Sequence, residues 1–347
     1  MKSYFESRSQ NCIYRYRQIL TELPDFVTDF FVGIEQTTSP LTRLNYAYDI
    51  RLFLDYLTNE LRLFECTDIK KITLSDLNLV RANHIERFLS YLSSYESSSD
   101  KMMTNGDRSK ARKLSAIKSL FKYFYNHDLL AENVSSKVEM PKLHDKPIIR
   151  LEADEVVKLL ENVEDGANLT ERERAYHKIT RTRDLAILTL MLGTGIRVSE
   201  CVGLNYEDVD FEINGIKITR KGGNQEIVYF GDEVRDALRS YMRDRLDKES
   251  IKLEPALFLS MQGKRINVRS VQLLVKKYAS ITTPLKKITP HKLRSTYGTS
   301  LYKETNDIYV VADVLGHKDV NTTKRHYAAI SDEIRRNAAN KVKLRED

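Results

Sequence analysis

A polar segment with two prolines, VEMPKLHDKPIIR at residues 138–150, interrupts the hydrophobic periodicity of this chain. Proline disfavours helix interiors and central strands, and segments of this composition commonly join domains. A chain of 347 residues is also long for a single hydrophobic core. The sequence therefore predicts a domain boundary near residue 145, with a helical domain at 20–130, a linker at 131–147 and a second domain at 148–340.

The first domain is predicted to consist of helices. In SPLTRLNYAYDIRLFLDYLTNE, Ser39 is a suitable N-cap and Pro40 suits the first helical position. Apolar residues then recur at helical spacing, namely Leu44, Ala47, Ile50, Leu54 and Leu57. The segment ANHIERFLSYLSSY predicts a second helix, and the serine-rich segment 93–107 predicts a loop.

A third predicted helix, RSKARKLSAIKSLFKYFYN, is strongly basic, and no acidic residue occurs between Asp107 and Asp128. Its apolar face is formed by Leu114, Ile117, Phe121 and Phe124. Because the charges have one sign, contact with phosphates is favoured over a solvated basic face. The predicted DNA-binding residues are Arg43, Arg108, Arg112, Lys113, Lys118 and Lys122.

The overall composition narrows the class of protein. The formal net charge is +7 and the pI about 9.0, which favours a polyanionic partner, nucleic acid before an anionic membrane. The three cysteines, Cys12, Cys66 and Cys201, are far apart and form no CxxC pair, so neither a disulfide framework nor a structural zinc site is expected.

No signal peptide is visible, and the most apolar stretch, LAILTLMLGTGI, is shorter than the span of about 18 residues that a membrane helix needs. We therefore expect a soluble, cytoplasmic protein with no membrane span. We also expect no cofactor and no metal.

The second domain is predicted to be helical around one small sheet. An apolar helix at 185–192 should be broken by Gly193 and Gly195, and a new helix should start around Arg197. The charged segment 164–182 predicts an inserted helix or loop to which we assign no role.

In GIKITRKGGNQEIVYF, Ile216 and Ile218 alternate with polar residues, as do Ile227 and Tyr229 after the Gly222–Gly223 turn, which predicts a hairpin. The predicted fold class is mainly α with a small antiparallel β-sheet.

Several cationic side chains and one hydroxyl group form a candidate site. Each residue alone has an ordinary structural explanation, such as a helix-surface ion pair or an exposed lysine at a turn. Together they include no carboxylate pair, no metal triad and no Ser-His-Asp order, and they suit attack of a hydroxyl on a phosphodiester. The candidates are Arg197, Glu200, Lys221, His291, Arg294, His317 and Tyr327.

The motifs GTGIRVSE, TRKGG, HKLR and LGH, followed by the tyrosine of TTKRHYAAI, have the order and spacing of a known family. Over residues 148–335 the chain resembles the tyrosine recombinases, or phage-integrase family, and most of all the bacterial Xer-type recombinases. The resemblance implies a DNA-clamping core-binding domain, an α+β catalytic domain with a C-terminal exchange helix, and a site-specific DNA strand transferase that needs neither metal nor ATP.

The resemblance also implies a role for each candidate. Arg197 and Arg294 would bind the scissile phosphate, with Lys221 as the general acid for the 5′ oxygen. His291 would assist proton transfer to and from the tyrosine, and His317 would hydrogen-bond the phosphate. Glu200 would support the phosphate-binding residues without touching the phosphate itself. Tyr327 would form a 3′-phosphotyrosyl link. The expected assembly is a homotetramer on paired double-stranded DNA sites, joined through the C-terminal helix.

Two departures from the Xer pattern leave the subfamily open. Ser295 stands where many Xer members have a second histidine. The separation from His317 to Tyr327 is one residue longer than in many Xer members, and His326 occupies the position that the tyrosine would have at the shorter spacing. Two biological roles are therefore open: resolution of chromosome dimers, and integration or excision of a mobile element. An activating protein partner is also possible under either role. A type IB topoisomerase-like enzyme and a catalytically inert DNA-binding protein are the alternative functions.

Overall fold

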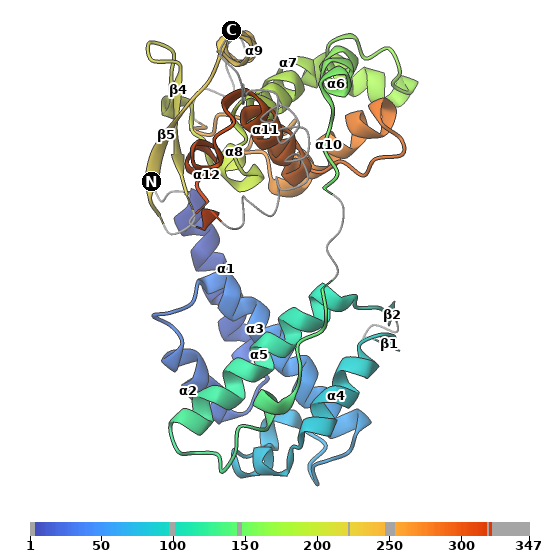
Figure 1. Cartoon of the computed structure of the whole chain (residues 1–347), viewed down its shortest axis with the longest axis vertical. Coiled ribbons are helices and arrows are strands. Elements are labelled where there is room, and N and C mark those ends of the chain that lie inside the picture. The colour runs from blue at the N-terminus through green and yellow to red at the C-terminus, as the bar shows by residue number, and fades with distance from the viewer. Residues whose placement is uncertain are drawn as a thin grey trace, which may run out of the picture. The chain divides into compact units, whose positions relative to one another are not determined.

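The computed structural model describes residues 4–96, 101–143, 148–220, 223–246, 254–317 and 319–320. The chain divides into two compact units, Met1–Asp145 and Lys146–Asp347, and the division lies between Pro141 and Pro147 (Figure 1). Each unit is described by itself.

The first unit is helical. Its elements are α1 (Tyr4–Leu20), α2 (Asp25–Gly33), α3 (Pro40–Asp55), η1 (Tyr56–Glu60), η2 (Ile69–Lys71), η3 (Ser75–Leu79), α4 (Ala82–Tyr91), α5 (Asp107–Asn126) and η4 (Val134–Lys137). Ser39 caps α3 by accepting a hydrogen bond from Thr42 N, and Pro40 opens the helix, as predicted. The apolar faces predicted for α3 and α5 are buried in one core, because α3 packs against both α1 and α5.

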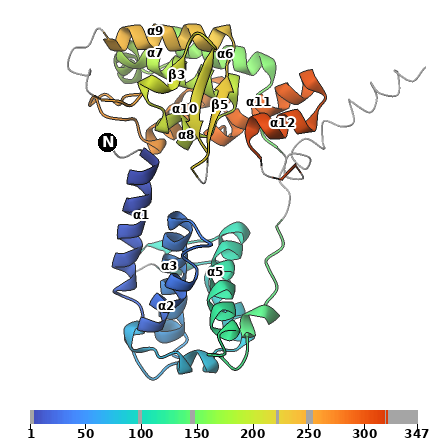
Figure 2. The same ribbon diagram turned by 90° about the vertical axis from the view of Figure 1, so that its left-hand side faces the viewer.

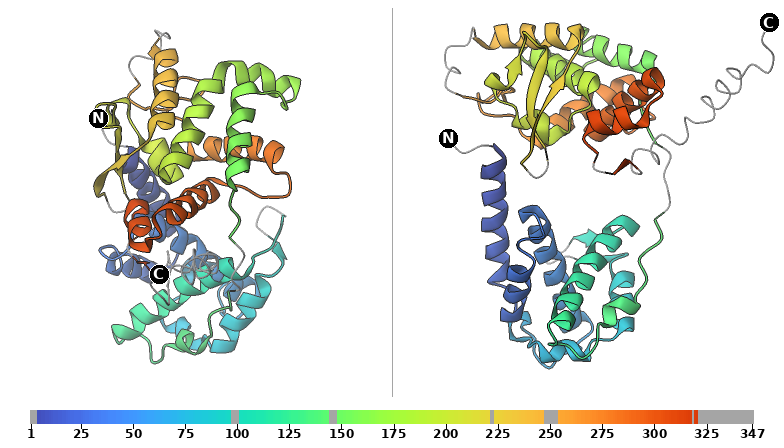
Figure 3. Two further views of the ribbon diagram at one scale, coloured as in Figure 1. Left: turned by 45° about the horizontal axis from the view of Figure 1, so that its top comes forward. Right: turned by 60° about the vertical axis from the view of Figure 1, so that its left-hand side comes forward.

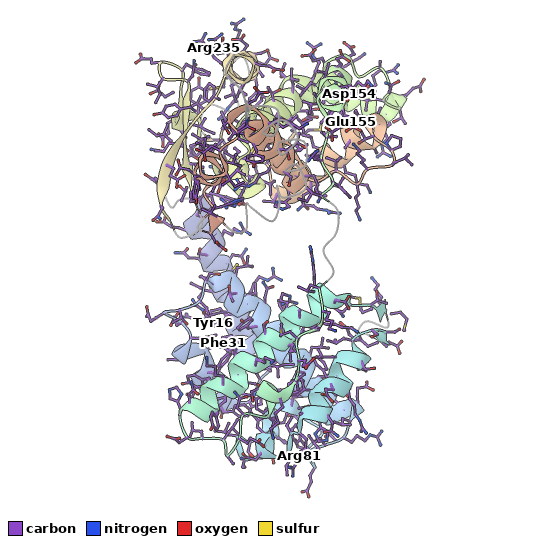
Figure 4. All side chains as sticks on the ribbon, in the orientation of Figure 1. Tyr16, Phe31, Arg81, Asp154, Glu155 and Arg235 are labelled. Atoms are coloured by element: carbon purple, nitrogen blue, oxygen red, sulfur yellow. The ribbon has the colours of Figure 1, made fainter. Side chains whose placement is uncertain are left out.

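This core extends past both predicted limits of the helical domain, 20 and 130. Tyr16 and Ile19 of α1 are buried in it, and Val134 and Val138 contribute from the other end. Tyr16 lies beside Phe31 of α2, with ring centroids 5.9 Å apart (Figure 4). The prediction missed α1 because its apolar residues are spaced among polar ones, and only packing against α3 shows which side is buried.

The segment 93–107 is not entirely a loop. Two short strands, β1 (Tyr95–Glu96) and β2 (Met102–Met103), form an antiparallel pair within it. The serine-rich composition conceals this pairing, because strands of two residues leave too short an alternation to detect in a sequence.

The second unit packs helices around a three-stranded antiparallel sheet of order β3-β4-β5. The strands are β3 (Val209–Asp210), β4 (Gly215–Thr219) and β5 (Gln225–Tyr229), preceded by η5 (Tyr206–Asp208). The helices are α6 (Ala153–Asp165), α7 (Glu171–Thr194), α8 (Val198–Gly203), α9 (Asp232–Leu246), α10 (Val268–Thr282), α11 (Pro290–Thr305) and α12 (Ile308–Leu315). Helix α9 lies along α7 (Figure 2), and α11 packs against α7 and α12 (Figure 3).

Helix α7 confirms a helix within the charged segment 164–182 and corrects the predicted break at Gly193. The charged segment 164–182 supplies much of its first half, and the helix runs for 24 residues without interruption to Thr194. Gly193 lies inside the helix, where a Cβ would meet Val234 of α9 at 2.5 Å, so this glycine allows close packing and breaks nothing. The helix ends at Gly195, whose φ of 63° is accessible to glycine at little cost.

The hairpin formed by β4 and β5 is present, with Ile216 opposite Val228. Ile216 and Ile218 are buried, and so is Val228, whereas Ile227 and Tyr229 are exposed. Ile227 and Tyr229, whose alternation predicted the second strand, therefore lie on its solvent-exposed face. The observed elements confirm the predicted mainly α fold with small antiparallel sheets. Among the described residues, no helix is both long and apolar enough to cross a membrane.

Candidate active site

Arg197 occupies the turn between α7 and α8, immediately before the first residue of α8. Glu200, in the first turn of α8, accepts a hydrogen bond from Arg197 N at 2.8 Å and another from Arg197 Nη1 at 2.8 Å. The carboxylate of Glu200 is buried, whereas the Arg197 side chain is about one-third exposed at 36%. The backbone and the side chain of Arg197 are thus held by the same carboxylate.

The C-terminal end of α12 carries His317. Gly316 adopts a φ of 59°, and Gly316 N and His317 N donate to Asp313 O and Ala312 O at 2.7 and 2.9 Å. This pair of bonds is a Schellman motif, which closes a helix and fixes the direction of the chain after it. Gly316 therefore closes α12 and places His317 on a short turn.

Three arginines donate to successive carbonyl groups at this helix end. Arg220 Nη2 reaches Val314 O at 3.0 Å, Arg294 Nη2 reaches Leu315 O, and Arg197 Nη2 reaches Gly316 O at 3.2 Å. The last carbonyls of a helix lack partners within the helix and carry partial negative charge, so cations gather there. Arg197, Arg294 and the turn before His317 are consequently brought together, as the candidate site requires.

Helix α11 carries the HKLR motif. Thr289 is the N-cap and Pro290 the first residue. His291 is exposed in this first turn. Arg294 points inward and is only 4% exposed. Arg294 Nη1 also donates to Gly195 O at 2.6 Å, so the same side chain ties the end of α7 to the end of α12.

Sequence reasoning missed Arg220. It is 7% exposed, and its Nε donates to Glu226 at 2.7 Å while its Nη1 lies 3.4 Å from Glu200. The signal was available, because Arg220 directly follows β4 and continues the alternation by which Ile216 and Ile218 are buried.

Four predictions fall outside the described residues. These are Lys221, Tyr327, the neighbouring His326 and the C-terminal exchange helix.

Two of the predicted DNA-binding residues are buried, and for them the prediction is wrong. Arg43 is 4% exposed, and its Nη1 donates to Glu35 O and Thr38 O at 2.7 and 2.9 Å. Lys113 is 8% exposed and bonds Asp49 at 3.1 Å. Both side chains stabilise the core margin of the first unit, where acceptors of the same unit hold them.

The other basic residues of α5 remain at the surface. Arg108, Arg112 and Lys122 are exposed, and Lys118 is half-buried. Arg112 binds the buried Asp49 of α3 through both Nη atoms. These four side chains keep the predicted basic face of α5.

Two other kinds of catalytic group, a reactive Cys201 thiol and a metal site, are not found in the described part of the chain. Burial raises the pKa of the Cys201 thiol to about 12, so this thiol is not a nucleophile at neutral pH. No cluster of three or more His, Cys, Asp or Glu side chains there could hold a metal ion. What the site offers is guanidinium groups and imidazoles, which suit binding of a phosphate.

The profile of the phage integrase family matches residues 149–333, which is more than half of the chain. The chain belongs to the phage integrase family. The tyrosine recombinase XerC of Caldanaerobacter subterraneus subsp. tengcongensis is 31% identical over 342 residues, covering 96% of this chain and 89% of the relative. The predicted resemblance to Xer-type tyrosine recombinases is therefore confirmed.

Two solved structures share the fold. One is the XerH site-specific recombinase bound to its difH substrate, with a TM-score of 0.59 at 20% identity, covering 84% of this chain and 76% of that one. The other is a lambda integrase tetramer bound to a Holliday junction, with a TM-score of 0.55 at 14% identity, covering 91% and 76%. Together with the family match and the Xer relative, they confirm the predicted enzyme class, a tyrosine site-specific recombinase.

Proposed function

We propose that the second unit of this phage integrase family member cuts and rejoins DNA strands through a covalent 3′-phosphotyrosyl intermediate at Tyr327. Arg197 and Arg294 bind the non-bridging oxygens of the scissile phosphate, and His317 donates a further hydrogen bond. Lys221 protonates the leaving 5′ oxygen. His291 assists proton transfer to and from the tyrosine. Because the bond energy is kept in the phosphotyrosyl link, a 5′ hydroxyl can reverse the reaction without ATP.

The observation that carries this proposal is the convergence of Arg197 and Arg294 on adjacent carbonyls, Gly316 O and Leu315 O, next to His317. Each arginine is held through both Nη atoms by the bonds described above, so the two guanidinium groups are fixed beside the turn that carries His317. Fixed cations of this kind stabilise the charge that develops on phosphoryl oxygens in the transition state, with no metal needed.

We also propose that the basic face of α5 in the first unit binds the phosphate backbone of double-stranded DNA. Arg108, Arg112, Lys118 and Lys122 follow one another along α5 at or near the surface. Such contacts supply affinity and register, and sequence choice must come from other residues that touch base edges. The fold shared with solved recombinase–DNA complexes supports this assignment.

The assembly and biological role follow from the family. We propose a homotetramer on two paired recombination sites, joined through the C-terminal residues, in the cytoplasm. The lambda integrase tetramer on a Holliday junction supports this arrangement. The XerC relative favours resolution of chromosome dimers over mobile-element integration.

Trapping on a nicked suicide substrate tests the chemistry. The substrate carries the recombination site recovered by selection from random or genomic DNA, and the cleaved strand loses a short fragment that cannot religate. We expect wild type to form a protein–DNA adduct that resists denaturant, and Tyr327→Phe to form none while binding the same duplex with unchanged affinity.

The remaining outcomes separate the alternatives. An adduct that persists in Tyr327→Phe would place the nucleophile elsewhere, and His326→Phe in parallel checks that neighbour. Relaxation of supercoiled DNA that lacks the site would favour the topoisomerase-like enzyme. Tight binding with no adduct from either protein, also with cell extract added as a source of an activating partner, would favour the inert DNA-binding protein.

A further inference from the structure

Arg220 directly follows the last residue of β4 and contacts two elements of the candidate site, α8 and the end of α12. Its backbone closes the hairpin, since Arg220 N donates to Asn224 O at 2.7 Å. Its side chain turns away from the hairpin tip into the protein and is 7% exposed. Its Nε, Nη1 and Nη2 all bond acceptors within the protein, so we expect any contribution of Arg220 to the reaction to act through other residues.

The partners of Arg220 belong to three separate elements. Nε donates to Glu226 of β5 at 2.7 Å, Nη1 lies 3.4 Å from Glu200 of α8, and Nη2 donates to Val314 O of α12 at 3.0 Å. Every nitrogen of the guanidinium therefore has an acceptor. The forked shape of arginine allows one side chain to fix the relative positions of all three elements, which a lysine cannot do.

The guanidinium also packs against the helix cap that precedes His317. A Cβ added at Gly316 would lie 2.8 Å from both Cζ and Nε of Arg220. Such a contact is closer than real side chains show, so a side chain at 316 would displace the guanidinium of Arg220 and would be strained by the φ of 59°. The position of the turn that carries His317 thus depends on Arg220.

Charge gives Arg220 a second effect. The buried carboxylate of Glu200 lies between two guanidinium groups, with Oε1 bound to Arg197 at 2.8 Å and Oε2 3.4 Å from Arg220. If Arg197 were the only cation beside it, this carboxylate would offset most of the positive charge that a phosphate should meet. Because Arg220 shares the carboxylate, Glu200 can orient Arg197 while Arg197 keeps its attraction for an anion.

We propose that Arg220 is a positioning residue for strand cleavage, which acts through Glu200 on Arg197 and through the last turn of α12 on His317. This inference rests on the proposed phosphotyrosyl chemistry. It differs from a purely structural role in one respect. Loss of Arg220 should lower the rate of cleavage in the folded, DNA-bound protein, and the loss should depend on the presence of Arg197.

The test is single-turnover cleavage of the suicide substrate by full-length protein at saturating concentration. Arg220→Gln is expected to cleave about 10- to 100-fold more slowly than wild type, because small displacements of catalytic groups have effects of this size. Its Kd for the duplex should stay within about threefold, since Arg220 touches no DNA. Arg220→Lys keeps the charge but loses the fork, and should recover part of the rate.

Arg245→Gln is the matched control. Arg245 is also buried, at 8% exposed, and donates to backbone carbonyls, including Leu257 O at 2.9 Å, but contacts none of the site residues. A general loss of packing would slow both variants equally once rates are corrected for the folded fraction. We expect Arg245→Gln to cleave at the wild-type rate after that correction.

A double-mutant cycle with Arg197→Gln identifies the route of action. Because one of the two proposed routes runs through Arg197, Arg220→Gln should slow cleavage by a smaller factor in the Arg197→Gln background than in wild type. The inference would be overturned if the effects of Arg220→Gln and Arg197→Gln on the cleavage rate multiplied fully, or if Arg220→Gln cleaved at the wild-type rate. In either case an adduct formed by wild type would still support the cleavage chemistry. Absence of an adduct from wild type would instead overturn the proposed function, and the inference with it.

Discussion

Glu200 in the second unit and Asp49 in the first are both buried carboxylates that hold a partly exposed arginine. Glu200 is 3% exposed and binds Arg197, and Asp49 is 1% exposed and binds Arg112. In each case the carboxylate restricts a side chain that would otherwise move freely in solvent. The two regions use the same local arrangement, and they differ in what surrounds it.

The second cation on each carboxylate shows that difference. Beside Glu200 it is Arg220, which reaches on to the carbonyls of α12, so three elements are fixed together. Beside Asp49 it is Lys113, which follows Arg112 along the same helix, so only α3 and α5 are joined. We propose that the first arrangement fixes geometry for chemistry, whereas the second holds a basic helix against its core. Catalysis depends on distances far more sharply than phosphate binding does.

The largest expected effect comes from Glu200→Gln, which removes the charge and weakens the bonds to Arg197. We expect single-turnover cleavage to slow by about 100-fold, because a misdirected guanidinium stabilises the transition state poorly. The affinity for the duplex should change by less than about threefold. The equivalent change Asp49→Asn should leave the cleavage rate within about threefold. Equal losses in the two variants would remove the distinction drawn between these carboxylates.

A smaller effect is expected from Arg112→Gln, measured as the salt dependence of binding to duplex DNA. Loss of one phosphate contact should lower the slope of log K against log salt by about 1 and weaken binding several-fold. Arg43→Gln is the control, because Arg43 is buried and bound to backbone carbonyls. If Arg43→Gln lowered the slope as much as Arg112→Gln, the assignment of the DNA-binding face would be wrong.

The smallest effect concerns pH. Burial raises the pKa of Asp49 above its ordinary value of 3.8, although Lys113 and Arg112 act in the opposite direction. Folding therefore favours the protonated carboxyl, and the stability that this group contributes is full below 3.8 and is lost as the pH rises through the raised pKa. Relative to Asp49→Asn, wild type should gain stability between pH 7 and pH 4, by about 1.4 kcal/mol for each unit of pKa difference.

Hydrogen exchange in α3 and α5 of the full-length chain measures this stability within the first unit. Asp29→Asn in α2 is the control, because Asp29 is exposed. Relative to Asp29→Asn, wild type should show no such gain. A wild type that loses stability relative to Asp49→Asn on acidification would mean that the two cations outweigh the burial of Asp49.

The sequence by itself determined the features that depend on neighbours a few residues away. Ser39 and Pro40 begin α3, Gly316 ends α12, and a regular apolar face defines α5. Capping, backbone conformation and helical periodicity are local effects, so they can be read without knowing the fold. The ordered motifs likewise identified the family, because their spacing survives in the linear chain.

Only the tertiary structure decided which charged side chains meet. Arg197 bonds Gly316, 119 residues further along the chain, and Arg220 joins the same helix end from the hairpin. Arg43 and Lys113 look like surface cations in the sequence, yet packing of α3 against its neighbours buries them. Charge and spacing do not reveal burial or distant partners, since both arise from how whole elements pack, and it is that packing which gathers the arginines around one helix end.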